Sequence, residues 1–287
     1  MEISSAKVKE LRERTGAGMM ECKKALVEAG GDIEKAITLM RRSGIAKAAK
    51  KAGRIAAEGV IVLAQAPEGQ RAAMIEVNCE TDFVTKADDF KLFAAALGRC
   101  VLHHRPADIA ALAQMPLVEG GDTVEACRQQ LIAKIGENIN IRRFALLETE
   151  GGGTLATYLH GNKKIGVLVD LHGGDAVLAK DIALHIAASR PICVTEEQVP
   201  ADLLAKEQEI YAAQAAESGK PAPIIEKIVA GRLQKFLQEV TLLGQPFVKD
   251  PETTVAKLLA RSPKARVRAF VRFEVGEGIE KKAENTV

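Results

Sequence analysis

Residues 72–86 read AAMIEVNCETDFVTK, an apolar run typical of a β-strand followed by a loop in which an acid and an aromatic stand side by side. A second apolar run, residues 59–63, precedes the first and is separated from it by the turn Pro67-Glu68-Gly69. After the loop, apolar residues recur at helical spacing from Asp88 to Leu102. The pattern predicts a β-hairpin that leads through the loop into a helix. With only ten aromatic residues in the chain, the Asp82-Phe83 pair is a candidate wedge against a partner. The alternative is that Phe83 packs inward, as an aromatic next to a strand end usually does.

The same order of elements occurs a second time. It consists of two apolar runs, the turn between them and a helix: residues 154–159 and 164–170, His160-Gly161-Asn162, and 176–189. Aligning Val77 with Val169 also aligns Phe90 with Ile182, so the core positions keep their register across the helix. We therefore expect an α+β fold with two related subdomains, each an antiparallel sheet covered by helices.

The pattern of residues 1–54 predicts a small helical domain, which we call the head. Apolar residues recur at helical spacing, and Thr15-Gly16-Ala17-Gly18 and Gly30-Gly31-Asp32 divide them into three helices of about ten residues each, with Asp32 as the N-cap of the third. The basic, alanine-rich run 46–54 is expected to be a solvated linker that is either helical or extended. Residues 1–57 carry 13 Lys and Arg against 7 Asp and Glu, so positive charge is concentrated at this end.

A helical insertion is predicted in the second half. Residues 200–217 and 223–243 are rich in Ala, Leu, Glu and Lys and are separated by Ser218-Gly219-Lys220-Pro221. The second of these helices carries one narrow apolar stripe: Ile225, Val229, Leu233, Phe236 and Val240. Such a stripe suits an antiparallel two-helix arm. The alternating run 267–275 then predicts a strand with one buried face.

These patterns predict four parts of the chain. They are a head with its basic linker at 1–54, a first core subdomain at 55–149, a second at 150–276 that includes the arm at 200–243, and a tail at 277–287.

Composition narrows the class of protein. A formal net charge of +2 predicts no strong field toward nucleic acid or a membrane, and the scarcity of aromatic residues argues against base stacking. The five cysteines form no CxxC pair, which favours reduced thiols. No apolar stretch reaches ~18 residues, and the N-terminus has no secretory pattern. We expect a cytoplasmic protein without nucleic-acid or membrane partners.

Motifs with catalytic chemistry are weak. Cys100, His103 and His104 cluster within about one helical turn, which leaves a metal-dependent hydrolase as an alternative, although structural zinc requires four ligands. Asp181 and His185 are four residues apart, which is typical of a pair on one helix face. Gly151-Gly152-Gly153-Thr154 lacks the lysine of a phosphate loop and predicts a turn. We therefore expect no catalytic site, no bound metal and no cofactor.

Five blocks of sequence resemble the bacterial elongation factor Ts family, in family order and from end to end of the chain. They are KELRERTGAGMMECKKAL (9–26), EVNCETDFV (76–84), KIGENINIRR (134–143), HIAAS (185–189) and RFEVGEGI (272–279). The resemblance implies that the protein is a guanine-nucleotide exchange factor for elongation factor Tu. It therefore also implies that the protein is not an enzyme. It also implies a head similar to a ubiquitin-associated three-helix domain. A module that binds ubiquitin-like proteins is the alternative function for this head.

The resemblance also implies which residues contact the partner. The loop Thr81, Asp82, Phe83 and Val84 corresponds to one that enters the partner near its magnesium and nucleotide. Further contacts are implied for Met19, Met20, Lys23, His160 and Val248. We expect one of the two methionines to fill the core of the head and the other to stay free. In the family the arm is associated with self-association, which makes a homodimer through the arm possible.

Overall fold

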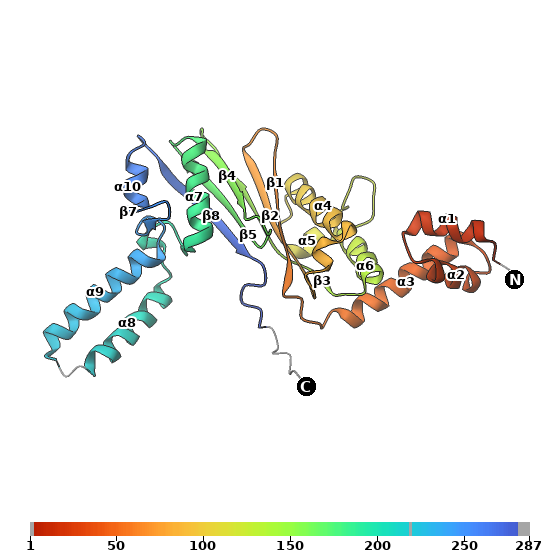
Figure 1. Ribbon diagram of the computed structural model, residues 1–287, viewed down its shortest axis with the longest axis horizontal. Helices are drawn as coiled ribbons and strands as arrows, with labels where there is room; N and C mark the ends of the chain where they lie inside the picture. The colour runs from red at the N-terminus through yellow and green to blue at the C-terminus, as the bar shows by residue number, and fades with distance from the viewer. Residues whose placement is uncertain (1–2, 218–219, 281–287) are drawn as a thin grey trace. The chain divides into compact units, whose positions relative to one another are not determined.

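The computed structural model of the protein describes residues 3–217 and 220–280, which fold into helices and antiparallel sheets (Figure 1). Two compact units are distinguished. The first contains residues 3–62, 75–144 and 275–280, and the second contains residues 63–74, 145–217 and 220–274. Ser218-Gly219 of the expected arm turn and residues 281–287 of the expected tail lie outside the described residues. The α+β class is confirmed.

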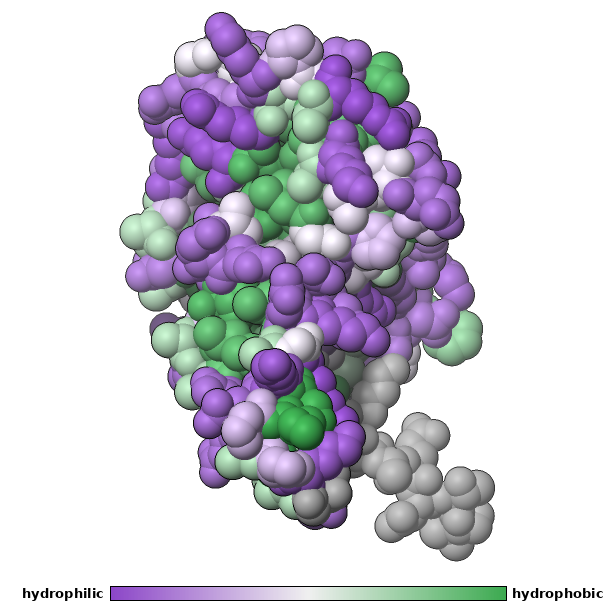
Figure 2. Space-filling model, turned by 90° about the vertical axis from the view of Figure 1, so that its left-hand side faces the viewer, coloured by the Kyte–Doolittle hydropathy of each residue, from purple (hydrophilic) through white to green (hydrophobic). Residues whose placement is uncertain are grey.

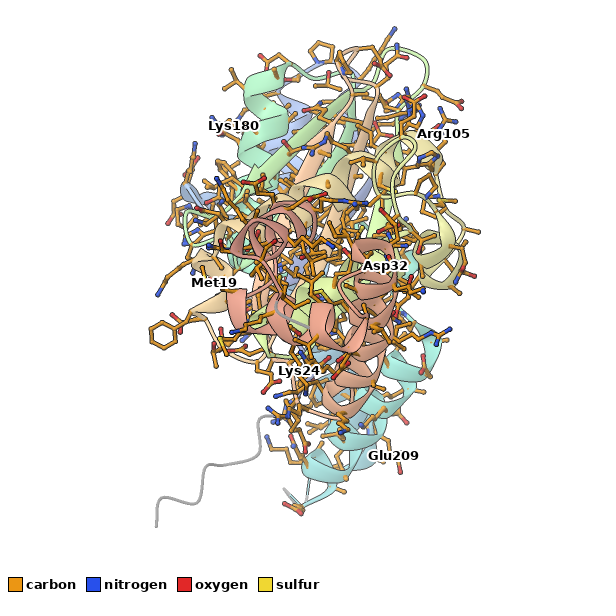
Figure 3. The ribbon with its side chains drawn as sticks, turned by 90° about the vertical axis from the view of Figure 1, so that its right-hand side faces the viewer. Met19, Lys24, Asp32, Arg105, Lys180 and Glu209 are labelled. Atoms are coloured by element: carbon orange, nitrogen blue, oxygen red, sulfur yellow. The ribbon has the colours of Figure 1, made fainter. Side chains whose placement is uncertain are left out.

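Three helices form the start of the first unit: α1 (Ser5–Thr15), α2 (Met19–Glu28) and α3 (Ile33–Lys51). Ser4 caps α1, and the Asp32 carboxylate accepts the Lys35 N–H at 3.0 Å, so the predicted N-cap is confirmed. Figure 3 labels Asp32 at the start of α3. Gly16 ends α1 with φ of 65°, a conformation that favours glycine. The helices enclose a small core that includes Leu11, Cys22 and Leu26.

Helix α3 is longer than expected. It has 19 residues and continues through the basic run to Lys51, so most of the expected linker is helical, and most residues of the run are exposed. Ala48 is buried, Lys47 pairs with Glu21, and α3 packs against α6. The alanines of the run explain the difference, because they favour helix and allow close packing on one face while the lysines remain in solvent.

The next part contains the first sheet and its neighbouring helices. The sheet has the strand order β1-β2-β3. The elements are β1 (Glu58–Gln65), β2 (Arg71–Cys79), the short 3₁₀ helix η1 (Val84–Lys86), α4 (Asp88–His104), α5 (Ile109–Gln114), α6 (Val124–Ile135) and β3 (Ile139–Glu148). Strand β2 is buried from Ala72 to Cys79. The loop of interest begins where this buried strand ends, so its base cannot shift without disturbing the core.

The second sheet is antiparallel, with the order β4-β5-β8: β4 (Thr154–Leu159), β5 (Ile165–His172) and β8 (Arg266–Glu274). Helix α7 (Ala176–Ser189) packs against β4 and β5. Its Ile182 and Ile186 share a core with Val167 and Val169 of β5. Val77, Val169, Phe90 and Ile182 are all fully buried, so the prediction that the four aligned positions belong to the core is confirmed.

The remaining elements of the second unit follow α7. They are the 3₁₀ helix η2 (Glu196–Gln198), α8 (Ala201–Ala216), α9 (Ala222–Val240), β6 (Pro246–Phe247), β7 (Asp250–Thr254) and α10 (Val255–Ala260). Helices α8 and α9 pack on each other as the predicted arm (Figure 1). No residue of α9 is fully buried, and Figure 2 shows apolar side chains reaching the surface between charged ones on the side that carries the arm. The short elements β6, β7 and α10 were not predicted from sequence.

Among the residues that the structure describes, no helix combines the length and the apolarity that crossing a membrane requires.

Candidate partner-binding site

The loop after β2 presents an aromatic side chain to solvent. Phe83 is 76% exposed, whereas the next residue, Val84, is 6% exposed and packs inward. The inward-packing alternative for Phe83 is therefore wrong. Val84 takes the core position instead, because the chain enters η1 at Val84 and a single turn can bury one side chain while the preceding one points outward.

Short-range hydrogen bonds order the tip of the loop. The Thr85 hydroxyl donates to the Asp82 carbonyl at 2.6 Å, and the Lys86 N–H donates to the Phe83 carbonyl at 3.1 Å. The Asp82 carboxylate pairs with the Lys86 ammonium at 3.0 Å, and that ammonium lies 5.2 Å from the Phe83 ring centre. Asp82 and Lys86 are both well exposed, so the ion pair adds little stability. The Asp82 carboxylate can therefore bind a partner when only its weak surface contact with Lys86 is broken.

The base of the loop is held by residues far along the chain. The Thr81 N–H and hydroxyl donate to the two oxygens of the Glu137 carboxylate, at 2.9 and 2.7 Å. In return, the Asn138 N–H donates to the Glu80 carboxylate at 2.6 Å. We call these four residues the reciprocal clasp. Sequence reasoning did not assign Glu80, Glu137 or Asn138 a role, and the available signal was that they lie in two of the five family-like blocks.

The clasp rests on the end of the head linker. The Asn138 side chain is fully buried and donates to the carbonyls of Ala52 and Arg54, at 3.4 and 2.8 Å. The Arg54 guanidinium reaches the Glu80 carboxylate at 3.4 Å. Charge-assisted hydrogen bonds of this kind are about twice as strong as neutral ones. The residues at the end of α3 and the loop after β2 therefore share one polar network.

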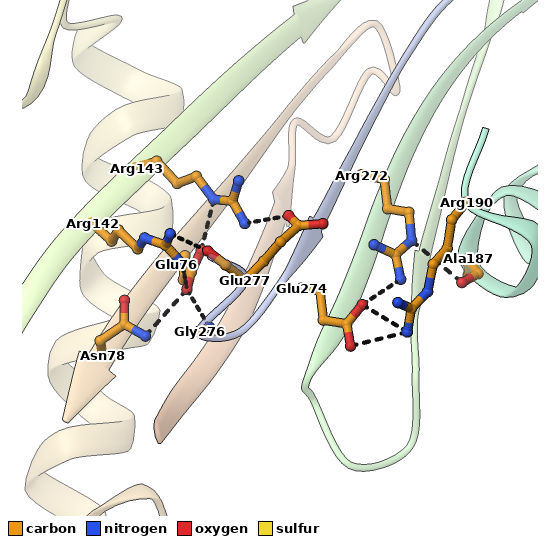
Figure 4. A network of polar contacts seen from close by, with 10 residues as sticks. All are labelled: Glu76, Asn78, Arg142, Arg143, Ala187, Arg190, Arg272, Glu274, Gly276 and Glu277. Atoms are coloured by element: carbon orange, nitrogen blue, oxygen red, sulfur yellow. Dashed lines mark hydrogen bonds and ion pairs between the residues drawn. The ribbon is translucent and has the colours of Figure 1, made fainter. Parts of the chain in front are cut away.

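A buried carboxylate supports β2 just before the loop. Glu76 is fully buried and accepts from Arg142 at 3.0 Å, Arg143 at 2.6 Å and the Gly276 N–H at 2.8 Å (Figure 4). Asn78 donates to it as well. Burial by itself would raise the pKa of Glu76, but the Gly276 N–H and the two guanidinium groups outweigh burial and hold this pKa below its ordinary value. Glu76 is therefore charged at neutral pH and joins β2 to β3 and the C-terminal return.

The expected contact residues of the head all lie on its outside. Met19 and Met20 are 61% and 76% exposed, and Lys23 is exposed. Figure 3 labels Met19 at the beginning of α2. The expectation that one methionine fills the core is wrong, because Ala17 and Met40 already pack against the core of the head. Two adjacent flexible thioether side chains are thus left in solvent, which is typical of adaptable binding surfaces.

His160 and Val248 occupy turns of the second unit. His160 is exposed in the β4–β5 turn, with its Nδ1 3.3 Å from the Tyr158 hydroxyl. Val248 is 41% exposed in the β6–β7 turn, and its N–H donates to Nδ1 of His185 at 3.1 Å. We call residues 245–249 the second-unit turn. Lys249 of this turn pairs with Asp181 at 2.7 Å.

The predicted pair between Asp181 and His185 is replaced by two separate contacts to the second-unit turn. His185 is fully buried, and its Nε2 lies 2.9 Å from Oε1 of Gln245. Because Nδ1 accepts the Val248 N–H, the proton of the neutral ring belongs on Nε2, where it is donated to Gln245. Burial lowers the pKa of His185 below its ordinary value, with a smaller opposing effect from Gln245. The histidine is therefore a neutral structural support.

The geometry gives the metal alternative no support. Across residues 3–217 and 220–280 no three His, Cys, Asp or Glu side chains gather in a way that could hold a metal ion. Cys100 is buried with its Sγ 3.5 Å from the Pro116 carbonyl, and burial raises the pKa of its thiol. A protonated, buried thiol is a poor metal ligand.

A groove of about 640 Å³ lies in the first unit between the head and helices α4 and α6. Its apolar lining includes Ile45, Leu92 and Val118. None of the expected contact residues lines it, so it is separate from the candidate site.

Comparison with known proteins identifies relatives over the whole chain. A sequence model described as Elongation factor TS matches residues 80–277. The chain is 64% identical to Elongation factor Ts of Thioalkalivibrio sulfidiphilus, an alignment that covers 99% of this chain and 96% of the relative. It is 58% identical to Elongation factor Ts of Methylococcus capsulatus and 53% identical to that of Legionella pneumophila, with the same coverage of both chains.

Proposed function

This chain belongs to the elongation factor Ts family, and we therefore propose that it is a translation elongation factor that acts as guanine-nucleotide exchange factor for elongation factor Tu. It binds the partner in its GDP form, displaces magnesium and so promotes the replacement of GDP by GTP. In this role the protein catalyses no chemical reaction and needs no cofactor of its own.

The observation that carries the proposal is the exposed aromatic tip. A phenylalanine that is 76% exposed, next to an exposed carboxylate and above a hydrogen-bonded base, is costly in water and favourable in an apolar crevice. Full burial of the Phe83 ring against a partner contributes about 1.5–3 kcal/mol. This free energy is available only in a partner conformation that opens to accept the ring, so binding selects that conformation.

The acid beside the ring supplies the second part of the mechanism. Asp82 brings a negative charge to the partner groups that hold magnesium, and loss of the metal removes the charge that neutralises the nucleotide phosphates. Factor and nucleotide then oppose each other's binding. By linkage, this protein lowers the affinity of elongation factor Tu for GDP by a certain ratio, and GDP lowers the affinity of elongation factor Tu for this protein by the same ratio.

Three other surfaces are proposed to hold the partner. Met19, Met20 and Lys23 form the contact of the head, whose three helices we propose to be ubiquitin-associated in type. His160 and Val248 are proposed as contacts from the second unit. Thr81 and Val84 support the loop at its base. The Thr81 N–H donates to the Glu137 carboxylate, and the Val84 side chain is buried. The arm formed by α8 and α9 is a candidate surface for a homodimer, and the site of action is proposed to be the cytoplasm.

Release of a fluorescent GDP analogue from elongation factor Tu, followed by stopped flow, tests the proposal. The full-length protein is expected to accelerate release in proportion to its concentration until saturation. Changing Phe83 and Asp82 together to alanine is expected to abolish most of this acceleration while the circular dichroism spectrum stays the same. Acceleration that survives the double change would disprove the wedge mechanism.

A further inference from the structure

The reciprocal clasp is the feature of the first unit that the exchange mechanism has not yet used. Glu137 lies in the loop between α6 and β3, 56 residues from Thr81, yet its carboxylate accepts both hydrogen bonds that Thr81 can donate from its N–H and its hydroxyl. Thr81 directly precedes Asp82 and Phe83. One side chain outside the loop therefore holds the residue from which the tip begins.

The clasp is anchored well enough to transmit that constraint. Asn138, next to Glu137, is fully buried, donates its side-chain N–H groups to the linker carbonyls and donates its backbone N–H to Glu80. Glu137 therefore stands on a fixed backbone. Because both oxygens of its carboxylate accept hydrogen bonds from Thr81, rotation of the carboxylate breaks at least one of these hydrogen bonds.

Above Thr81, the tip is held by the buried side chain of Val84 and by contacts within the turn. The hydrogen bonds from Thr85 and Lys86 stay within the turn, and the Asp82–Lys86 pair is exposed. These contacts keep the shape of the turn but do not fix its direction relative to β2. Without the Glu137 contacts the tip would be anchored only on its Val84 side. The turn would then sample more orientations, and ordering it in the complex would cost conformational entropy.

We infer that Glu137 is a positioning residue for nucleotide exchange, which holds the Asp82-Phe83 tip in the orientation that enters the partner. This inference rests on the proposed function. Glu137 acts through Thr81, so its substitution slows the exchange step more than it weakens the first encounter with the partner. The head and the second-unit contacts still support that encounter.

The test uses full-length variants in the GDP-release assay at saturating concentrations. Glu137→Gln keeps the size of the side chain but removes the negative charge and one of the two acceptor oxygens, so both charge-assisted hydrogen bonds from Thr81 cannot be kept. We expect the maximal rate of release to fall about tenfold, the effect of losing one charge-assisted hydrogen bond. The half-saturating concentration is expected to change less than about twofold, because the encounter surfaces are intact.

The same substitution in a Phe83→Ala background separates positioning from other roles. If Glu137 acts through the tip, Glu137→Gln has almost no further effect there, because the side chain to be positioned is missing. A full tenfold loss in that background, or an unchanged maximal rate in the Glu137→Gln variant alone, overturns the inference. If Phe83→Ala itself leaves release as fast as in the wild type, the proposed function fails instead.

Two further measurements protect the test against a folding defect. Asp108→Asn is the matched control, because Asp108 caps the Ala111 N–H of α5 at 2.7 Å in the same unit without touching the loop, and it is expected to leave the release rate unchanged. Amide hydrogen exchange of Thr81 in the free proteins gives a readout independent of the partner. Protection in the wild type that is lost in a Glu137→Ala variant, which has no acceptor, supports the clasp, and equal protection in both contradicts it.

Discussion

The loop after β2 and the second-unit turn each present an apolar side chain to solvent, but different chemical groups hold them in place. Each presents an apolar side chain, Phe83 at 76% and Val248 at 41% exposure, and each is fixed by a side chain that accepts a backbone N–H from the loop. In the first case the acceptor is the Glu137 carboxylate, and in the second it is the neutral ring of His185. The first loop is supported by a carboxylate side chain, the second by a buried imidazole ring that must stay uncharged.

This difference teaches that the two loops respond to different conditions. The carboxylates below the first loop belong to networks with Arg54, Arg142 and Arg143, and the pKa of Glu76 is held low. The support of the second-unit turn depends on the pKa of His185, which burial lowers. The Glu76 network at β2 is therefore expected to be insensitive to mild acid, and the second-unit turn sensitive to it.

The largest effect is expected from Glu76→Gln. This change leaves two guanidinium groups without their buried carboxylate, which we expect to lower the free energy of unfolding by about 3 kcal/mol. Urea denaturation of the full chain measures it. Glu125→Gln is the control, since Glu125 pairs with Arg128 in the same unit but on a partly exposed helix face, and a loss below about 1 kcal/mol is expected there. Equal losses in the two variants would mean that burial of the Glu76 network is unimportant.

Phe83→Ala and Val248→Ala compare the two presented side chains directly. Losing the larger, more exposed ring is expected to slow GDP release about 10- to 100-fold, since its burial contributes about 1.5–3 kcal/mol. Losing two methyl groups at Val248 is expected to slow it only a few-fold. Stopped-flow release gives both rates, and Leu92→Ala, which truncates another exposed side chain of the first unit, is the control expected to have no effect. A larger loss at Val248 than at Phe83 would reverse the roles of the two loops.

Mild acid is expected to destabilise the second unit selectively. With its folded pKa lowered below the ordinary value of 6.5, His185 stabilises the fold fully above pH 6.5. This stability is lost as pH falls toward the folded pKa, because the unfolded chain binds a proton that the folded one excludes, at most about 1.4 kcal/mol per pH unit. Glu76, whose folded pKa is also lowered, loses its contribution only below about pH 4.5.

Hydrogen exchange at pH 7.5 and 5.5 checks this difference between the Glu76 network and the second-unit turn. Faster exchange of the Val248 amide at pH 5.5, after correction for the intrinsic rate, with unchanged protection of the Gly276 amide that donates to Glu76, is the expected result. Substitution of the exposed His160 by Gln serves as control and should leave the pH dependence as it is. An NMR titration in which His185 gains its proton above pH 6.5 would contradict the assignment.

The smallest effect is expected at Lys249. Its pair with Asp181 is partly exposed, so Lys249→Ala is expected to cost about 0.2–1 kcal/mol and to cost less at high salt. Thermal denaturation at two salt concentrations measures it. An effect as large as that of Glu76→Gln would show that surface charge, and not the buried histidine, fixes the second-unit turn.

Much of the secondary structure followed from local patterns. Strand β4 and helix α7 begin and end at the predicted residues, because period-2 and period-3.6 patterns with clear turn residues leave little choice. Helix α3 was underestimated, since an alanine-rich basic run fits both a helix and a solvated linker until a packing partner is known. The elements β6, β7 and α10 are too short for periodicity to reveal them.

By itself, the sequence determined the α+β class, the arm, the family and the residues of the exposed loop. Spacing of apolar residues and runs of family-like sequence are local properties that survive without coordinates. Only the tertiary structure decided that Phe83 points outward while Val84 packs inward, that both methionines of α2 are exposed, and that Glu137 and His185 hold the two loops. These features depend on hydrogen bonds and packing between segments about 60 residues apart, and such contacts are fixed by the folded arrangement of the core and not by any pattern along the chain.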